Sequence, residues 1–175
     1  LSGLVGSEMC IRDSMQWALK NVPGDCIFEW WIRLDGAAAR VHCRLTNQRS
    51  DMTQYPAKSQ ELPAVYGIGK LSRLFTYTGD APFTGGTLTQ IPSTPPPWNS
   101  WTATENWSAM VNSSDFGIGV HKPGAVKHIG GYHSSATIGT GGATDDNTAY
   151  ISPIFSEILD GNLVYEYDFN LIVGT

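Results

Sequence analysis

The chain has 175 residues, a formal net charge of −5, 15% charged and 41% hydrophobic residues. This composition excludes a disordered chain and a charged coiled coil, and the length suits one domain with its own core. The basic residues are scattered, so we expect no nucleic acid partner. No stretch approaches the roughly 20 consecutive apolar residues that cross a bilayer, so we expect no membrane partner either.

Residues 1–14, LSGLVGSEMCIRDS, resemble a translated cloning or sequencing adapter. We expect them to be a non-native segment ahead of a single domain over residues 15–175. The two remaining cysteines, Cys26 and Cys43, are too few for a disulfide framework. An apolar strand runs into Thr175, which predicts a fragment of a larger protein. Compartment and oligomeric state stay open.

The clearest local pattern is a β-hairpin near the start of the chain. Two β-rich runs, Ile27–Leu34 and Ala37–Leu45, flank the dipeptide Asp35-Gly36. Asp-Gly suits the positive φ angles of a type I′ turn, so the sequence predicts a two-residue hairpin there.

The predicted register places Leu34 opposite Ala37 and divides the hairpin into two faces. One face is apolar and includes Trp30, which we expect in the core. The other face carries two favourable cross-strand pairs, Trp31 with Arg40 and Glu29 with His42.

Further strands follow from alternating polar and apolar residues and from turn formers between the runs. Pro92–Pro97 predicts a stiff surface crossing, Gly139–Asn147 a loop, and Ile154–Leu159 the one short helix. The predicted strands are Arg73–Thr78, Glu105–Asn112, Phe116–His121 and Leu163–Val173, with the second and third forming a hairpin. The sequence therefore predicts an all-β protein, an antiparallel β-sandwich.

Part of the chain resembles a known sandwich family. The run Glu29–Tyr66, with the phrases Arg44–Asn47 and Gln60–Tyr66, resembles strands of galactose-mutarotase-like supersandwiches. The segments Glu105–Val111 and Phe116–Val120 are similar to a hairpin of bacterial carbohydrate-active sandwich proteins. The resemblance implies a supersandwich or jelly-roll-like fold and a poly- or oligosaccharide ligand.

The same resemblance limits the expected activity. The paired catalytic histidines of the epimerases have no counterpart that we can place here, and a complete supersandwich is longer than this chain. We therefore expect a fragment of a larger carbohydrate-processing protein rather than a simple mutarotase. Fold analogy alone does not establish an activity.

Two carboxylates are candidates for general acid–base catalysis. Glu61 lies in a segment flanked by Tyr55 and Tyr66, where partial burial raises a carboxyl pKa. Glu105, beside Trp107, is the second candidate. A pair about 5–5.5 Å apart predicts retaining glycoside hydrolysis, and about 6.5–9.5 Å inverting hydrolysis. The alternative for Glu61 is a carboxylate that caps loop amides.

Three histidines, His121, His128 and His133, lie close together in the sequence beside Lys122. A polysaccharide lyase needs a base and a cation that neutralises a uronate carboxylate, and this stretch carries both kinds of group. The alternative is ordinary surface histidines. The intervals between them are not chelate spacings, so we expect no metal and no cofactor.

Aromatic side chains are the candidates for saccharide contact, although their commonest role is core packing. Trp98 and Trp101 follow the proline run, where loops at a sandwich edge are exposed. The expected substrate-binding residues are Trp31, Arg40, Tyr66, Trp98, Trp101 and Lys122.

Two functions of different classes remain. The first is an enzyme, glycoside hydrolase- or polysaccharide lyase-like, in which Glu61, Glu105 and one histidine act on a glycan. The second is a non-catalytic carbohydrate-binding or structural β-sandwich module of a larger enzyme. A viral or structural jelly roll is a third, lesser alternative.

Overall fold

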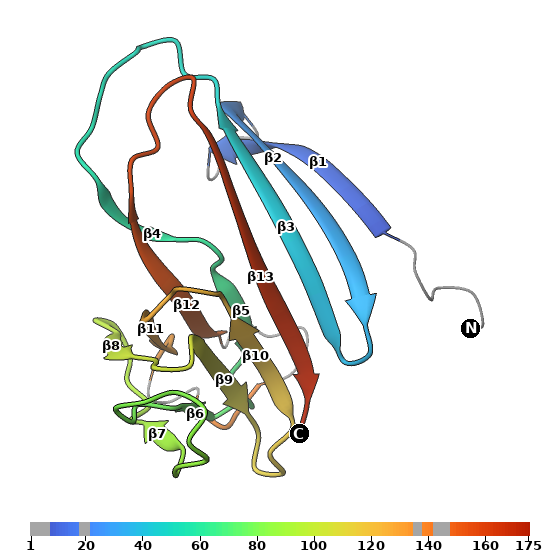
Figure 1. Cartoon of the computed structure of the whole chain (residues 1–175), viewed down its shortest axis with the longest axis vertical. Coiled ribbons are helices and arrows are strands. Elements are labelled where there is room, and N and C mark those ends of the chain that lie inside the picture. Colours follow the sequence, from blue (N-terminus) through green and yellow to red (C-terminus); the bar gives the residue numbers. More distant parts are fainter. Residues whose placement is uncertain (1–7, 18–21, 135–137, 142–147) are drawn as a thin grey trace. The chain divides into compact units, whose positions relative to one another are not determined.

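The computed structural model describes residues 8–17, 22–134, 138–141 and 148–175. Over these residues the protein is all-β, with antiparallel strands and no helix, which confirms the predicted fold class (Figure 1). No helix in this part of the chain is therefore long and apolar enough to span a membrane. The chain divides into two compact units, Leu1–Ser59 with Ser156–Asn170, and Gln60–Phe155 with Leu171–Thr175.

The first unit is built on one antiparallel sheet in the order β1-β2-β3-β13. Its strands are β1 (Glu8–Trp17), β2 (Val22–Asp35), β3 (Ala38–Asn47) and β13 (Val164–Gly174), whose last residues belong to the second unit. Strands from both ends of the sequence therefore lie side by side. The prediction that residues 1–14 are non-native stays a prediction, although β1 includes seven of them.

The predicted hairpin is confirmed, but its register is two residues away from the predicted one. Asp35 pairs with Ala38, so the two-residue loop is Gly36-Ala37. Gly36 has φ +60° and Ala37 has no positive φ, which is the pattern of a type II′ turn with glycine first. The prediction of a type I′ turn at Asp35-Gly36 was wrong, because Asp35 is still part of strand β2.

A shift of two residues preserves the faces of a strand and changes the partners. Trp31 faces His42, and Glu29 faces Arg44. The residues of the polar face were therefore predicted correctly, whereas their cross-strand partners were not. On the opposite, apolar face Trp30 is 40% exposed, so its expected place in the core was wrong.

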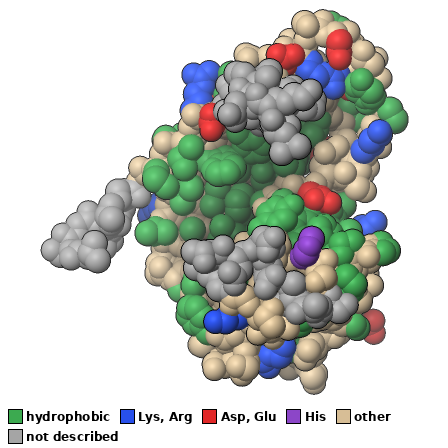
Figure 2. Space-filling model, turned by 180° about the vertical axis from the view of Figure 1, so that it is seen from behind, with side chains coloured by type: hydrophobic (Ala, Val, Ile, Leu, Met, Phe, Trp, Pro, Cys, Tyr) green, Lys and Arg blue, Asp and Glu red, His purple; other side chains and the backbone are tan. Residues whose placement is uncertain are grey.

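The apolar face of this sheet is lined from β3 and β13. Cys43 is 1% exposed, and Tyr167 and Phe169 are also buried. Figure 2 shows hydrophobic side chains gathered on the surface seen from behind the view of Figure 1. Burial raises the pKa of Tyr167 well above its usual value. The sheet is thus apolar on one side and polar on the other.

The second unit holds two groups of strands. One has the order β10-β9-β6-β7, and in the other β4, β12, β11 and β8 follow one another while β5 also pairs with β12. The first two residues of β4 and the last two of β12 belong to the first unit. Their bounds are β4 (Lys58–Glu61), β5 (Val65–Ile68), β6 (Arg73–Thr76), β7 (Thr89–Ile91), β8 (Asn99–Thr102), β9 (Trp107–Val111), β10 (Gly117–His121), β11 (Lys127–Tyr132) and β12 (Thr148–Glu157).

Strands β9 and β10 form the second predicted hairpin, with Gly117 opposite Val111. The proline run Pro92–Pro97 lies between β7 and β8 and contains no strand residue, as predicted. The expected helix over Ile154–Leu159 was wrong, because strand β12 continues to Glu157. Of the predicted loop Gly139–Asn147, residues 142–147 lie outside the described residues.

The core of the second unit is assembled from buried residues of these strands, and in β12 five consecutive residues are buried. Its largest fully buried side chains include Leu74, Met110, Tyr132, Tyr150 and Ile151. Burial raises the pKa of Tyr132 to about 12. The hydroxyl of Tyr132 donates a hydrogen bond to the carbonyl of Leu71 at 2.7 Å. The buried phenol is therefore satisfied by the backbone of the same unit.

Candidate functional site

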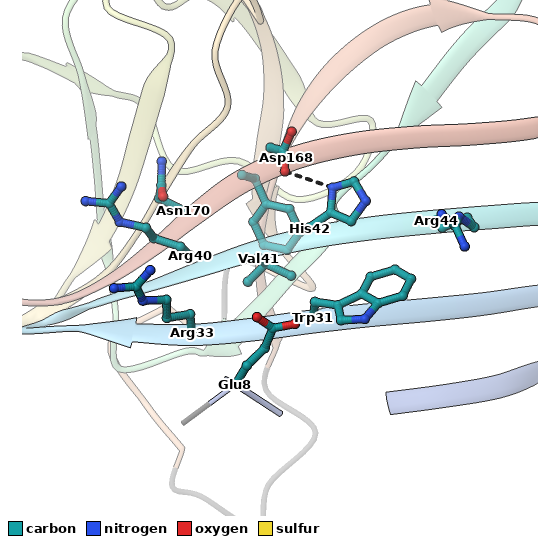
Figure 3. Close-up of a pocket in the computed structure, with 10 residues that line it drawn as sticks. Glu8, Trp31, Arg33, Arg40, Val41, His42, Arg44, Asp168 and Asn170 are labelled. Carbon is teal, nitrogen blue, oxygen red and sulfur yellow. Dashed lines mark hydrogen bonds and ion pairs between the residues drawn. The ribbon is translucent and has the colours of Figure 1, made fainter. Parts of the chain in front are cut away.

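The polar face of the first unit's sheet is hollowed into a groove of about 560 Å³. Strands β1, β2, β3 and β13 supply it, because their alternate residues point to this side. We call it the Trp31 groove, and its main polar and aromatic lining residues are Glu8, Trp31, Arg33, Arg40, His42, Arg44 and Asp168 (Figure 3). Two of them, Trp31 and Arg40, are predicted substrate-binding residues.

At the centre of the groove His42 is paired with Asp168. The Nδ1 atom of His42 lies 2.9 Å from Oδ1 of Asp168 (Figure 3). This contact favours the tautomer in which Nδ1 carries the hydrogen, because the Nδ1–H group then donates a hydrogen bond to the carboxylate. No described residue bonds Nε2, so the second ring nitrogen is left as a base. Orientation of an imidazole by a carboxylate is the arrangement that acid–base sites use.

An aromatic ring and a cation lie directly beside this pair. The rings of Trp31 and His42 have centroids 5.3 Å apart, and the guanidinium of Arg44 lies 5.3 Å from the Trp31 ring. Arg44 in turn donates from Nε to Glu166 at 2.6 Å. Two side chains of β3 therefore contact the indole, which also lines the groove.

The pairing of His42 with Asp168 was not predicted from the sequence. Alternation places both residues on polar strand faces, but they are 126 positions apart. Only the adjacency of β3 and β13 brings them together. A single sequence carries no signal for that adjacency.

Glu61 lies at the end of β4 and is exposed. It contacts Tyr150, whose pKa is raised well above its usual value, mainly by burial and further by the Glu61 carboxylate. The Tyr150 ring also contacts two predicted aromatic residues: Tyr66 at 5.0 Å and Trp98 at 4.4 Å between centroids. The structure thus gathers Glu61, Tyr66 and Trp98 around one buried tyrosine.

Glu105 has different neighbours and both of its oxygens are occupied. One accepts a hydrogen bond from the amide of Phe83 at 2.8 Å, and the other accepts from Nε1 of Trp107 at 2.9 Å. Phe83 has a positive φ of 59°. The carboxylate therefore holds a turn in place.

Replacing Glu105 with Ala is expected to lower the free energy of unfolding by about 1–3 kcal/mol, because two hydrogen bonds to a carboxylate are lost. Urea denaturation measures the change. Asp80→Ala is the matched control, since Asp80 is an exposed acid in the adjoining loop and its removal is expected to change stability by less than about 0.5 kcal/mol. Equal stability of the Glu105→Ala variant and wild type would contradict this structural role.

His128 is fully buried in a chain of hydrogen bonds. Nε1 of Trp101 donates to Oγ of Ser108 at 3.1 Å, and that oxygen lies 3.0 Å from Nδ1 of His128. Nε2 of His128 contacts the carbonyl of Ala125 at 3.1 Å. Burial lowers the pKa of His128 to about 4, so the ring is neutral at pH 7. Its two nitrogens and the Trp101 indole nitrogen are all used inside the protein.

Lys122 is 3% exposed. Its Nζ donates to the carbonyl of Leu62 at 2.6 Å and lies 4.3 Å from the Phe155 ring. This places the ammonium group in the interior, where it binds backbone and an aromatic ring. Nε1 of Trp98 likewise donates to a carbonyl, that of Tyr132, at 3.1 Å.

The two other predicted histidines lie on the surface of the second unit. His133 is exposed, just after β11. His121 ends β10 opposite Trp107 and lines a mostly apolar groove of about 430 Å³. The structure therefore does not gather His121, His128 and His133 into one site. No group of three His, Cys, Asp or Glu side chains in the described ranges is placed to hold a metal ion.

The sequence matches no protein-family model and no curated protein. Among solved structures, the chain is similar to a putative aldose 1-epimerase from Escherichia coli K12, with a TM-score of 0.50 and 10% identity. The match covers 95% of this chain and 65% of that chain. The match shows that the two chains share an antiparallel β-sandwich fold. This chain spans less than two thirds of the length of that relative.

Two further solved structures are similar. A galactose mutarotase-like protein from Lactobacillus casei has a TM-score of 0.48 and 11% identity, over 95% of this chain and 70% of that chain. A galactose mutarotase related enzyme from Lactobacillus acidophilus has a TM-score of 0.44 and 10% identity, over 96% of this chain and 68% of that chain.

Proposed function

We propose that the protein is a carbohydrate-processing protein that binds a saccharide in the Trp31 groove, where His42 transfers a proton. The observation that carries this proposal is the 2.9 Å contact between His42 and Asp168 beside the Trp31 ring. A flat indole suits the apolar face of a pyranose ring. The similarity of the fold to a putative aldose 1-epimerase supports a sugar as the ligand.

The chemistry follows from the tautomer of His42. Nε2 accepts a proton from a sugar hydroxyl, and the Asp168 carboxylate stabilises the imidazolium that forms. The same nitrogen then returns the proton to a sugar oxygen. This supports proton transfer at the sugar more than hydrolysis by two carboxylates, because neither Glu61 nor Glu105 lines the groove.

The second candidate is a non-catalytic carbohydrate-binding module. It is favoured by the exposure of the pair, since the side chains of His42 and Asp168 are 38% and 76% exposed. Water competes for an exposed general base and weakens electrostatic contributions to catalysis. In a module, His42 and Asp168 hydrogen-bond sugar hydroxyls without turnover.

The test measures binding and proton transfer separately. Ligand-observed NMR with D-galactose and galactotetraose reports binding, and the rate of interconversion of the two anomers reports chemistry. We expect Trp31→Ala to weaken binding at least tenfold, because it removes the flat surface beneath the sugar. We expect His42→Gln to preserve binding and to reduce any catalysed interconversion at least a hundredfold.

Tyr55→Ala is the matched control, because Tyr55 is an exposed aromatic residue of the same unit outside the groove. Unchanged binding by Trp31→Ala would contradict the proposal. Binding without interconversion in both wild type and His42→Gln would favour the module.

A further inference from the structure

Two arginines face each other across strands β2 and β3. Arg33 and Arg40 are direct partners in the register of the hairpin, and both line the Trp31 groove (Figure 3). Like charges at directly opposite positions repel, and their Cβ atoms are about 4.5–5.5 Å apart in such a pair. The fold therefore concentrates positive charge at one end of the groove.

The neighbouring carboxylates leave many of the N–H donors of this pair unused. Arg40 donates to Asp35, in an exposed ion pair. No described side chain forms an ion pair with Arg33. Glu8 lies opposite Arg33 on β1 and also lines the groove, and its carboxylate accepts from Sγ of Cys10 at 4.0 Å. Each guanidinium group carries five N–H donors, more than the carboxylates of Asp35 and Glu8 can use, so donors remain for an anion.

The spacing of the strands relates this pair to the rest of the groove. Arg33 and Arg40 form the rung of the hairpin two residues from the rung of Trp31 and His42. Two residues of an antiparallel strand span about 6.8 Å, which is close to the width of a substituted pyranose ring. A sugar over Trp31 thus places a ring substituent at the arginines.

We propose that the saccharide taken by the Trp31 groove is anionic, with a carboxylate or sulfate group held between Arg33 and Arg40. The inference rests on the proposed function and adds the class of substrate. Guanidinium groups bind planar carboxylates and sulfate oxygens in paired hydrogen bonds, which a neutral sugar cannot accept with the same strength. The repulsion between the two arginines is relieved when the anion binds.

The experiment compares three oligosaccharides by calorimetry at low salt: tetragalacturonate, its methyl ester and a sulfated galactotetraose. We expect wild-type protein to bind at least one acid form about tenfold more tightly than the ester, and this preference to shrink as salt is raised. The two acid forms tell which anion is preferred. Arg33→Gln and Arg40→Gln are each expected to remove the preference for the acid forms over the ester.

Lys58→Gln is the matched control, since it removes one exposed positive charge of the same unit outside the groove. Equal affinity of wild type for the acid forms and the ester would overturn the inference and leave the proposed function standing. If wild-type protein binds none of the three oligosaccharides, both the inference and the proposed function are overturned. Thermal unfolding separates binding from folding, because Arg33→Gln is expected to be at least as stable as wild type.

Discussion

Between pH 6.5 and pH 4 the protein is expected to lose about 3 kcal/mol of its free energy of unfolding through one side chain, His128. Burial holds the pKa of this histidine at about 4, whereas the unfolded chain takes up the proton near pH 6.5. In this range the unfolded state binds more protons than the folded state, so stability rises with pH. The contribution is complete above pH 6.5 and is lost as pH falls toward 4.

Urea denaturation at several pH values measures this dependence. His128→Gln is expected to flatten it, because glutamine keeps a donor and an acceptor near Ser108 and Ala125 without titrating. His133→Gln, which replaces an exposed histidine, is the control and is expected to keep the wild-type slope. An NMR titration of the wild-type His128 ring gives the pKa directly. A value near 6.5 there would contradict the prediction even where the variant fails to fold.

The second large effect is expected at Gly117, where the β10 backbone approaches β9 closely. A Cβ atom at this position would lie 1.9 Å from the carbonyl oxygen of Met110 and 2.7 Å from Cα of Val111. Both atoms belong to backbone and cannot rotate away. We expect Gly117→Ala to lower the free energy of unfolding by about 3 kcal/mol or more, because the hairpin must open.

Gly119, on the same strand, is the matched control. A Cβ atom there would meet Ala109 at 3.6 Å, an ordinary contact. Gly119→Ala is expected to be neutral or stabilising by up to about 1 kcal/mol, because alanine restricts the unfolded chain. Differential scanning calorimetry of the two variants separates steric conflict from loss of flexibility. Equal stability of both variants would show that the strand shifts to accept the methyl group.

The all-β class and the two faces of the first hairpin are predictable from the sequence, because side-chain alternation depends only on neighbouring residues. The register of that hairpin is not. Asp35-Gly36 is a common turn dipeptide, but glycine at the first loop position is equally permitted, and the loop moved by one residue. The helix expected at Ile154–Leu159 failed for a related reason, since a short apolar run does not distinguish helix from buried strand.

The candidate site was predictable only in part. Trp31 and Arg40 were predicted because they lie on the polar face of a hairpin that is local in sequence. Asp168 reaches His42 only through the pairing of β3 with β13, which sequence pattern does not determine. His128 and Lys122 are buried, and their closeness to other histidines in the sequence did not indicate this burial.

The position of β13 beside β3 has a consequence for synthesis of the chain on the ribosome. The hairpin of β2 and β3 is made first, and Asp168 follows His42 only 126 positions later. Until then the backbone amides and carbonyls of β3 have no neighbour on one side, and such an exposed edge can join the edge of another nascent chain. The pairing of β13 with β3 therefore covers this edge and brings Asp168 to His42 at the same time.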